Sequence, residues 1–223
     1  MLEQLIGIDQ DITLWINGLH TAWSDSFWMF LSNIRVWFPA YGAIMGFMIW
    51  RLGWKKGLVV ILTCILTVVL CDQISSHVKD TVGRLRPLYS TWMLQHGLHW
   101  PLGRYDFYGF FSGHASNSFG FAACSYLGFQ WNDRNHRYKV YGICALVWAG
   151  LMSLSRIMLA AHYFGDVLVG TVFGLSVGSL CALLGRFVIV RMKLSKNCLY
   201  SFRWWSCCRP ARNRWKTRPG TRL

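Results

Sequence analysis

Long apolar stretches separated by short polar segments dominate the hydrophobic pattern of this chain. A helix that spans a bilayer needs about 20 apolar residues, because each adds about 1.5 Å and the hydrocarbon core is about 30 Å thick. Four stretches meet or approach this length: Gly57–Val78, Phe110–Trp131, Val140–Ser155 and Tyr163–Val190. A fifth, shorter stretch runs from about Trp37 to Trp54. The pattern predicts an all-α fold, an integral membrane helix bundle with about five transmembrane helices.

The N-terminal segment, residues 3–22, has a different pattern. Its apolar positions are interleaved with Asp9, Asp11 and Asn17. This mixture favours an amphipathic helix that lies on the membrane surface or packs against the bundle. A sixth transmembrane helix in this segment is the alternative.

Composition agrees with a membrane protein. Hydrophobic residues make up 54% of the 223 residues, and charged residues only 14%. Soluble domains usually have about 45–50% apolar and about 25% charged residues. The chain also contains 13 Trp and 9 Tyr, two residue types that collect at membrane–water interfaces.

The positive charges are distributed unevenly, and this distribution predicts an orientation. The formal net charge is +14, yet residues 1–34 contain no Lys or Arg. Cytoplasmic loops of membrane proteins carry an excess of both. With five spans, the basic segments 51–56, 134–139 and 191–223 all fall on the cytoplasmic side, and the loop 79–109 and the turn 156–162 fall outside. We therefore expect one transmembrane domain, 1–190, followed by a basic cytoplasmic tail, 191–223, that contacts anionic lipid rather than nucleic acid.

Unusual polar residues gather on the predicted outer side. They are Lys79, Arg84, Arg86, His96, His99, Arg104, His114, Arg156, His162 and Asp166. Ionisable groups at membrane depth are costly and by default indicate a functional site. Several fixed cations suit a phosphate group, and two histidines can supply a nucleophile and a general acid near neutral pH.

The spacing of these residues makes the hypothesis more specific. Ser112-Gly113-His114 opens an expected helix, and the free N–H groups at a helix N-terminus form an anion site. Gly113 allows a phosphate to approach the backbone. His162 and Asp166 are four residues apart and so share a helix face. A carboxylate in that position can hold an imidazole in one tautomer.

Three motifs then give a specific family resemblance. They are Lys79 followed after six residues by Arg86-Pro87; Ser112-Gly113-His114; and Ser155-Arg156, five residues, His162, three residues, Asp166. In this order they resemble the three signatures of the type 2 phosphatidic acid phosphatases and vanadium haloperoxidases. They extend over residues 79–166, about two fifths of the chain. One position departs from the pattern: Phe111 stands where the second signature usually begins with Pro.

The resemblance implies a role for each matched residue. His162 would attack phosphorus and form a phosphohistidine, Asp166 would orient His162, and His114 would protonate the leaving oxygen. The phosphate oxygens would be bound by Lys79, Arg86, Ser112, Gly113 and Arg156. The resemblance implies no metal or other cofactor for the phosphatases, which agrees with a total of only nine Asp and Glu.

The function that follows is a membrane lipid phosphatase acting on a lipid phosphomonoester or diphosphate. The short loop between the first two signatures resembles that of the undecaprenyl diphosphate phosphatases, which makes undecaprenyl diphosphate the preferred substrate. A lipid A, phosphatidylglycerophosphate or phosphatidic acid phosphatase is the alternative, and a lipid phosphotransferase or a transporter is the alternative outside the hydrolases. We expect a bacterial plasma membrane protein whose site faces the periplasm or exterior.

Two features lie outside the signatures. Arg84 is expected to face solvent or lipid phosphates, and the loop 88–109 either touches the headgroup or is a plain surface loop.

Overall fold

A computed structural model describes residues 2–101, 103, 105–133 and 136–205, with side chains as far as Met192. Most of the basic tail therefore lies outside the described residues. The chain divides into two units, residues 1–188 and 189–223. Every residue of the predicted site belongs to the first unit.

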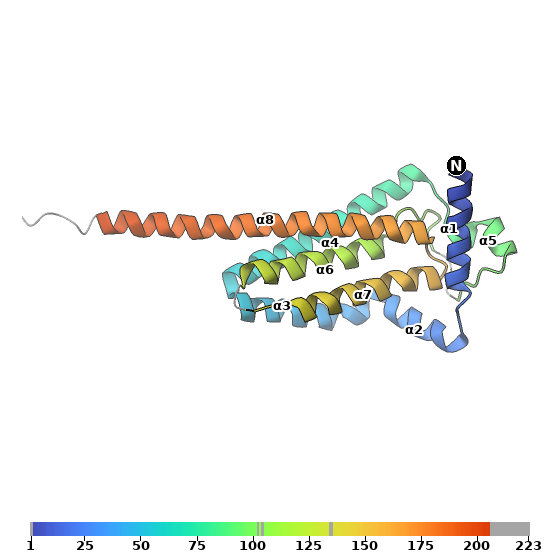
Figure 1. Cartoon of the computed structure of the whole chain (residues 1–223), viewed down its shortest axis with the longest axis horizontal. Coiled ribbons are helices and arrows are strands. Elements are labelled where there is room, and N and C mark those ends of the chain that lie inside the picture. The colour runs from blue at the N-terminus through green and yellow to red at the C-terminus, as the bar shows by residue number, and fades with distance from the viewer. Residues whose placement is uncertain (1, 102, 104, 134–135, 206–223) are drawn as a thin grey trace, which may run out of the picture. The chain divides into compact units, whose positions relative to one another are not determined.

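The described residues form helices and contain no β-strand, which confirms the all-α prediction (Figure 1). The helices are α1 Leu2–Asn17, α2 Ala22–Ser32, α3 Phe38–Leu52, α4 Trp54–Val82, α5 Thr91–Gln95, α6 Gly113–Asn132, α7 Lys139–Met158 and α8 Phe164–Trp205. Two short 3₁₀ turns, Ile34–Trp37 and Pro87–Tyr89, precede α3 and α5. The sequence pattern did not predict α2 or α5.

Helix α6 is the centre of the bundle. It packs against α4 and α7, and α3 packs against α4 (Figure 1). Three glycines of α8 at four-residue intervals, Gly170, Gly174 and Gly178, face backbone carbonyls of α6. A Cβ atom at Gly170 would lie 2.6 Å from the carbonyl oxygen of Ser112. Small residues at such spacing let two membrane helices approach closely, so the glycine row determines how α8 packs on α6.

Three helical segments are long and apolar enough to cross a membrane: Trp54–Val82, Lys139–Met158 and Phe164–Met192. The chain is therefore an integral membrane protein. Helix α3 has only 15 residues, and the central helix α6 is rich in serine. Its Ser116, Ser118 and Ser125 hydroxyls donate to carbonyl oxygens of the preceding helical turn, so they are satisfied inside the bundle. A total of five spans remains a prediction.

Two of the predicted cytoplasmic loops lie at the same end of the bundle. At the end of α3, Arg51 Nη2 lies 3.2 Å from Asp133 Oδ2. Arg51 also donates from Nε to the Tyr138 hydroxyl, at 3.3 Å. These contacts join the α3–α4 connection to the α6–α7 connection. The last turn of α4 and the first turns of α6 and α8 lie at the opposite end (Figure 1).

Helix α1 lies across that opposite end and packs against it with its polar side (Figure 1). Thr13 and Asn17, four residues apart, are buried, whereas Trp15 is 70% exposed. The Asn17 amide donates to the carbonyl of Met158 at 3.0 Å, at the end of α7. The helix is amphipathic, as predicted, and its buried polar residues face the protein together with Leu14 and Ile16. Other apolar residues, among them Ile8 and Trp15, are exposed.

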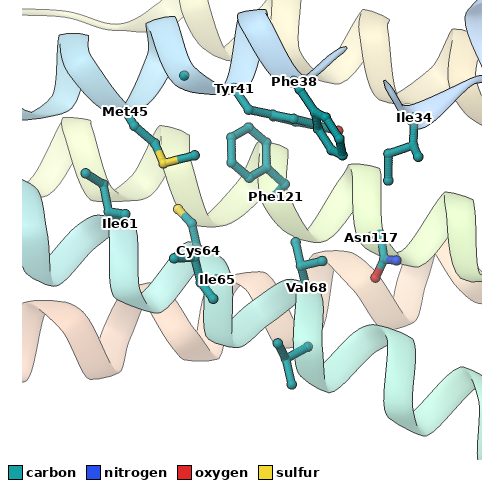
Figure 2. Close-up of a pocket in the computed structure, with 12 residues that line it drawn as sticks. Ile34, Phe38, Tyr41, Met45, Ile61, Cys64, Ile65, Val68, Asn117 and Phe121 are labelled. Carbon is teal, nitrogen blue, oxygen red and sulfur yellow. The ribbon is translucent and has the colours of Figure 1, made fainter. Parts of the chain in front are cut away.

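A largely apolar groove of about 490 Å³ lies between α3, α4 and α6 (Figure 2). Its lining includes Phe38 and Tyr41 from α3 and Phe121 from α6. Figure 2 shows Asn117 and Ile34 together at one end of the groove. Asn117 follows His114 by one turn of α6, so this end of the groove lies next to the predicted site.

Candidate active site

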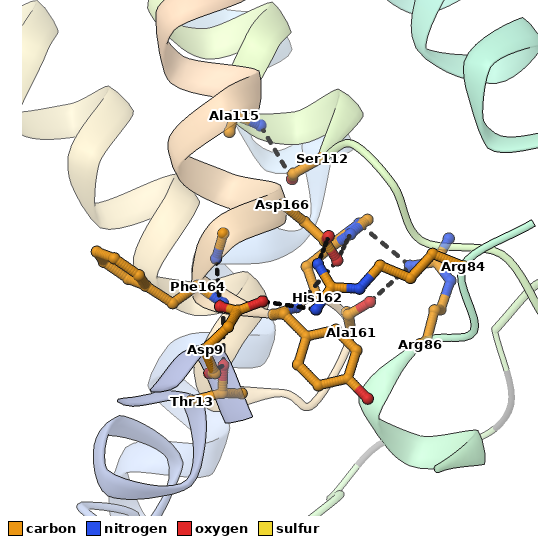
Figure 3. A network of polar contacts seen from close by, with 12 residues as sticks. Asp9, Thr13, Arg84, Arg86, Ser112, Ala115, Ala161, His162, Phe164 and Asp166 are labelled. Atoms are coloured by element: carbon orange, nitrogen blue, oxygen red, sulfur yellow. Dashed lines mark hydrogen bonds and ion pairs between the residues drawn. The ribbon is translucent and has the colours of Figure 1, made fainter. Parts of the chain in front are cut away.

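The three motifs meet at one end of the bundle (Figure 3). The first occupies the end of α4 and the strand-like segment after it, the second begins α6, and the third spans the turn from α7 into α8. The fold thus brings together motif residues that are up to 87 positions apart in the sequence, from Lys79 to Asp166.

The first motif depends on how α4 ends. Gly83 has φ +63°, and its N–H donates to the Lys79 carbonyl at 3.0 Å. This left-handed conformation favours glycine and stops the helix. Lys79 therefore lies in the last turn of α4, while Arg84 and Arg86 follow in the loop after the helix.

Arg86 lies directly beside the predicted nucleophile. Its side chain is buried and donates from Nε to the Asp106 carbonyl at 2.7 Å and from Nη1 to the Ala161 carbonyl at 2.9 Å. Nη1 also lies 3.1 Å from His162 Nε2. A guanidinium has no acceptor atom, so Nε2 must accept and the imidazole proton must reside on Nδ1. The lone pair of His162 therefore points toward a group suited to phosphate.

The second motif forms the N-terminus of α6. Ser112 is the N-cap: its Oγ accepts from the Ala115 N–H at 3.4 Å, and its own N–H donates to the Asp166 carbonyl at 3.0 Å. A Cβ atom at Gly113 would lie 3.6 Å from Lys79 Nζ, so the ammonium group reaches this helix end. His114, in the first turn, is half-buried. An ammonium and unpaired backbone N–H groups therefore converge here, which suits an anion.

The third motif supplies Arg156, which is 5% exposed in the last turn of α7. Its Nη1 donates to the Ser32 hydroxyl of α2. The guanidiniums of Arg156 and Arg86 each lie 5.3 Å from the centre of the Tyr105 ring, within cation–π range. Ser32 and Tyr105 were not identified from the sequence, because neither belongs to a motif.

His162 and Asp166 are both buried, with exposed fractions of 2% and 0%. His162 Nδ1 lies 3.7 Å from Asp166 Oδ2, an ion-pair distance that is too long for a hydrogen bond. Oδ2 accepts the Tyr163 N–H at 3.1 Å, and Oδ1 accepts from Arg84 at 2.6 Å. The pair is thus brought together as expected, but the carboxylate is held mainly by other groups.

The expectation that Arg84 faces solvent or lipid phosphates is wrong. Arg84 donates to Asp166 and, at 2.6 Å, to Asp9 of α1. Its guanidinium also lies 4.1 Å from the centre of the Tyr163 ring. Nothing in the local sequence indicated that α1 would bring a carboxylate to this loop. Arg104, the other additional cation considered, lies outside the described residues.

Burial controls the protonation of His162. Removal from water lowers the pKa of its imidazole well below the usual value, and the charges of Arg86, Arg156 and Lys79 lower it further. Desolvation and nearby cations both disfavour the imidazolium form. His162 is therefore neutral at neutral pH, the state in which Nε2 can act as a nucleophile.

The loop 88–109 contributes to two regions. Toward its middle, His99 Nε2 lies 2.8 Å from Asp25 Oδ2 of α2 and its ring stacks on His20 at 3.7 Å, away from the site. Toward its end, Tyr105 and Asp106 contact Arg86. The later part of the loop therefore belongs to the site, and the earlier part fastens the loop to the N-terminal helices.

The described residues contain no group of three or more His, Cys, Asp or Glu arranged to hold a metal ion. The positive charge of the site comes from its side chains, Lys79, Arg86 and Arg156. Metal independence itself remains a prediction.

Comparison with known proteins agrees with this geometry. Residues 52–188, more than half of the chain, match the family model described as the PAP2 superfamily. A lipid A 4′-phosphatase of Bacteroides thetaiotaomicron is 31% identical over 176 residues, 78% of this chain and 75% of the relative. A lipid A 4′-phosphatase of Porphyromonas gingivalis is 26% identical over 79% of this chain and 72% of its own. The crystal structure of a PAP2-type phosphatidylglycerolphosphate phosphatase from Bacillus subtilis superposes with a TM-score of 0.61 at 20% identity, covering 84% of this chain and 87% of that one.

Proposed function

This chain belongs to the PAP2 superfamily and is a membrane lipid phosphatase, and we propose that it removes a phosphate from lipid A through a phosphohistidine on His162. The choice of lipid A rests on the sequence identity to the lipid A 4′-phosphatase of Bacteroides thetaiotaomicron, which extends over three quarters of that relative's length. The preference among substrates therefore changes from undecaprenyl diphosphate to lipid A, its first alternative.

In the first step, Nε2 of neutral His162 attacks phosphorus. The P–N bond forms as the bond from phosphorus to the lipid oxygen breaks, and His114 gives its proton to that oxygen. Arg86 now touches Nε2 at 3.1 Å, so its donors turn from the imidazole to the phosphate oxygens when substrate binds. Lys79, Arg156 and the N-terminus of α6 stabilise the charge that develops on the remaining oxygens.

In the second step, water replaces the histidine. His114, now neutral, accepts a proton from the attacking water, and the P–N bond breaks to release inorganic phosphate and regenerate His162. The proton on Nδ1 faces Asp166, and this carboxylate stabilises the positive charge that His162 carries in the intermediate.

The groove between α3, α4 and α6 supports a lipid substrate (Figure 2). Apolar side chains such as Ile65 and Val68 line it, and they suit a hydrocarbon chain whose headgroup lies at the site. Asn117 is a polar residue of its lining at the end near His114, and its Oδ1 is buried without a hydrogen-bond partner among the described residues. The acyl chains of lipid A carry amide and hydroxyl groups close to the sugar, which an amide could bind, whereas a polyprenyl chain carries none. This feature favours lipid A over undecaprenyl diphosphate.

The test compares kcat/KM for phosphate release from lipid A, undecaprenyl diphosphate, phosphatidylglycerophosphate and phosphatidic acid in mixed micelles, since substrate discrimination is expressed in that ratio. We expect lipid A to be the best substrate, with EDTA having no effect. Asn117→Leu should lower kcat/KM for lipid A about tenfold, from the loss of one hydrogen bond to substrate, and leave undecaprenyl diphosphate within about twofold. Asn132→Leu, at the other end of α6, is the matched control. Preferential turnover of undecaprenyl diphosphate by about a hundredfold would contradict the choice of lipid and leave the reaction class intact.

A further inference from the structure

A charged residue of α1 reaches the catalytic end of the bundle. Asp9 Oδ2 accepts from Arg84 Nη2 at 2.6 Å, and Asp9 Oδ1 accepts from the Gly165 N–H at 2.7 Å (Figure 3). Each oxygen of this carboxylate therefore has its own partner. One partner is a cation next to Asp166, and the other is the first turn of α8, which carries Asp166.

Arg84 connects Asp9 to the catalytic carboxylate. While Nη2 is held by Asp9, Nη1 donates to Asp166 Oδ1 at 2.6 Å. The Arg84 side chain is only partly exposed, and that of Asp166 is fully buried. A buried carboxylate is costly unless it is paired and hydrogen-bonded. Among the described residues, Arg84 is the cation whose side chain donates a hydrogen bond to Asp166.

The division of the guanidinium between two carboxylates has a geometric consequence. Arg84 occupies only Oδ1 of Asp166, which leaves Oδ2 to accept the Tyr163 N–H and to lie 3.7 Å from His162 Nδ1. Without Asp9, Arg84 would be free to pair with both oxygens of Asp166, the arrangement that guanidinium and carboxylate groups often adopt. Oδ2 would then be drawn away from His162.

We propose that Asp9 and Arg84 are positioning residues for the catalytic pair: Asp9 restrains Arg84 to one oxygen of Asp166, which leaves the other to orient His162. This inference rests on the roles proposed above for His162 and Asp166. It makes α1, which contains none of the three motifs, a functional part of the active site.

The same contacts also cap α8, and the two effects can be separated. Thr13 Oγ1 accepts the Phe164 N–H at 3.0 Å, so α8 has a second cap from α1. In Asp9→Asn the amide oxygen can still accept the Gly165 N–H, as asparagine does at helix N-termini. This substitution therefore removes the charge that restrains Arg84 and retains the cap.

The experiment measures kcat and KM for wild type, Asp9→Asn, Asp166→Asn and the double variant, on lipid A and on a soluble phosphate ester. Asp11→Asn, on an exposed position of the same helix, is the control. We expect Asp9→Asn to lower kcat about tenfold with KM within about twofold, because orientation of His162 affects the chemical step. In the Asp166→Asn background the same change should have no further effect, because Asp9 acts through Asp166. Arg84→Lys keeps the charge but replaces the planar fork, whose two nitrogens each hold one carboxylate, with a single nitrogen on a shorter reach, so it should behave like Asp9→Asn.

Two results would overturn the inference: an Asp9→Asn variant with wild-type kcat, or a double variant whose fold-loss in kcat equals the product of the two single fold-losses. If Asp9→Asn does not yield folded protein, the cycle of Arg84→Lys with Asp166→Asn provides the same comparison. Failure of the proposed function would look different, since wild-type protein would then release no phosphate or His162→Ala would remain active.

Discussion

At the residue scale, His162 lies between Arg86 and Asp166, and each of its two ring nitrogens faces one of them. Arg86 contacts Nε2 at 3.1 Å, and Asp166 lies 3.7 Å from Nδ1. The first contact requires a lone pair on Nε2, and the second favours the proton on Nδ1. The neutral tautomer present before substrate binds is therefore already the one that can attack phosphorus.

The depressed pKa of His162 predicts the pH dependence of catalysis. His162 must be neutral to react, and burial followed by the neighbouring cations lowers its pKa. The protonated, inactive fraction therefore grows only below the usual histidine range of about 6.5. A plot of kcat/KM against pH should therefore have its acidic limb below about pH 6.5. An acidic limb at or above that value would contradict the burial of the nucleophile.

The role of His114 predicts a dependence on the leaving group. His114→Ala should lower kcat about 10²–10⁴-fold for a lipid phosphomonoester, whose alkoxide leaves poorly without a proton. The loss should be much smaller for p-nitrophenyl phosphate, because its phenolate leaves unaided. His96→Ala, an exposed position in the loop 88–109, is the control. Equal losses on both substrates would assign His114 to binding rather than to proton transfer.

The motifs of fixed spacing were enough to propose Lys79, Arg86, His114 and Arg156 as site residues. The structure places these residues at or next to helix ends, because the first motif follows α4 to its end, the second begins α6 and the third joins α7 to α8. Other partners were missed because their contribution depends on tertiary packing. Asp9 approaches Arg84 from 75 positions away, and no periodicity or spacing within α1 indicates which of its acidic residues turns inward.

At the element scale, the row of glycines on α8 determines how the third motif meets the second. Ser112 of α6 donates its N–H to the Asp166 carbonyl of α8 at 3.0 Å. One helical turn further on, Gly170 faces the carbonyl of Ser112. Close packing of these two helices therefore holds the N-terminus of α6, the predicted phosphate site, against Asp166.

This packing predicts the effect of a larger side chain. A Cβ atom at Gly174 would meet the backbone of Ser116 on α6, whereas one at Gly150 of α7 would meet nothing within 4 Å. Gly174→Leu should destabilise the fold by about 1–3 kcal/mol through overpacking and lower activity with it. Gly150→Leu should have no destabilising effect. Thermal unfolding in detergent measures both, and an unchanged melting temperature for Gly174→Leu would show that α8 is not held in this way.

Helices were predictable in proportion to the length of their apolar runs. Helices α4, α6, α7 and α8 correspond to the four long runs, and α3 to the shorter fifth. The short helices α2 and α5 lacked such a signal. Helix α8 continues past Val190 to Trp205, since Lys and Arg are good helix formers and a polar boundary does not end a helix. The direction in which α1 faces depended on the helix ends that it caps, which the sequence pattern does not encode.

At the scale of the whole molecule, charge and site lie at opposite ends of the first unit. The basic α3–α4 and α6–α7 connections are joined through Arg51 and Asp133. The turn from α7 into α8, which contains His162, lies at the other end (Figure 1). The positive-inside rule predicts that the basic end is cytoplasmic. The site would then face the periplasm or exterior.

Cysteine labelling tests this orientation. In a variant without native cysteines, Gln95→Cys and His136→Cys place single thiols at exposed positions near opposite ends. A membrane-impermeant maleimide applied to intact cells should label position 95. Position 136 should react only after the membrane is permeabilised. The reverse pattern would place the active site on the cytoplasmic side.

The covalent intermediate on His162 gives the most direct test of the proposed mechanism. Purified protein is mixed with lipid A that carries ³²P on its phosphomonoester and quenched within one turnover. Wild type should retain label in a bond that is stable to base and labile to acid, as a phosphohistidine is, and His162→Ala should retain none and release no phosphate. Phosphate release by wild type without any trapped label, or a labelled and active His162→Ala variant, would contradict His162 as the nucleophile.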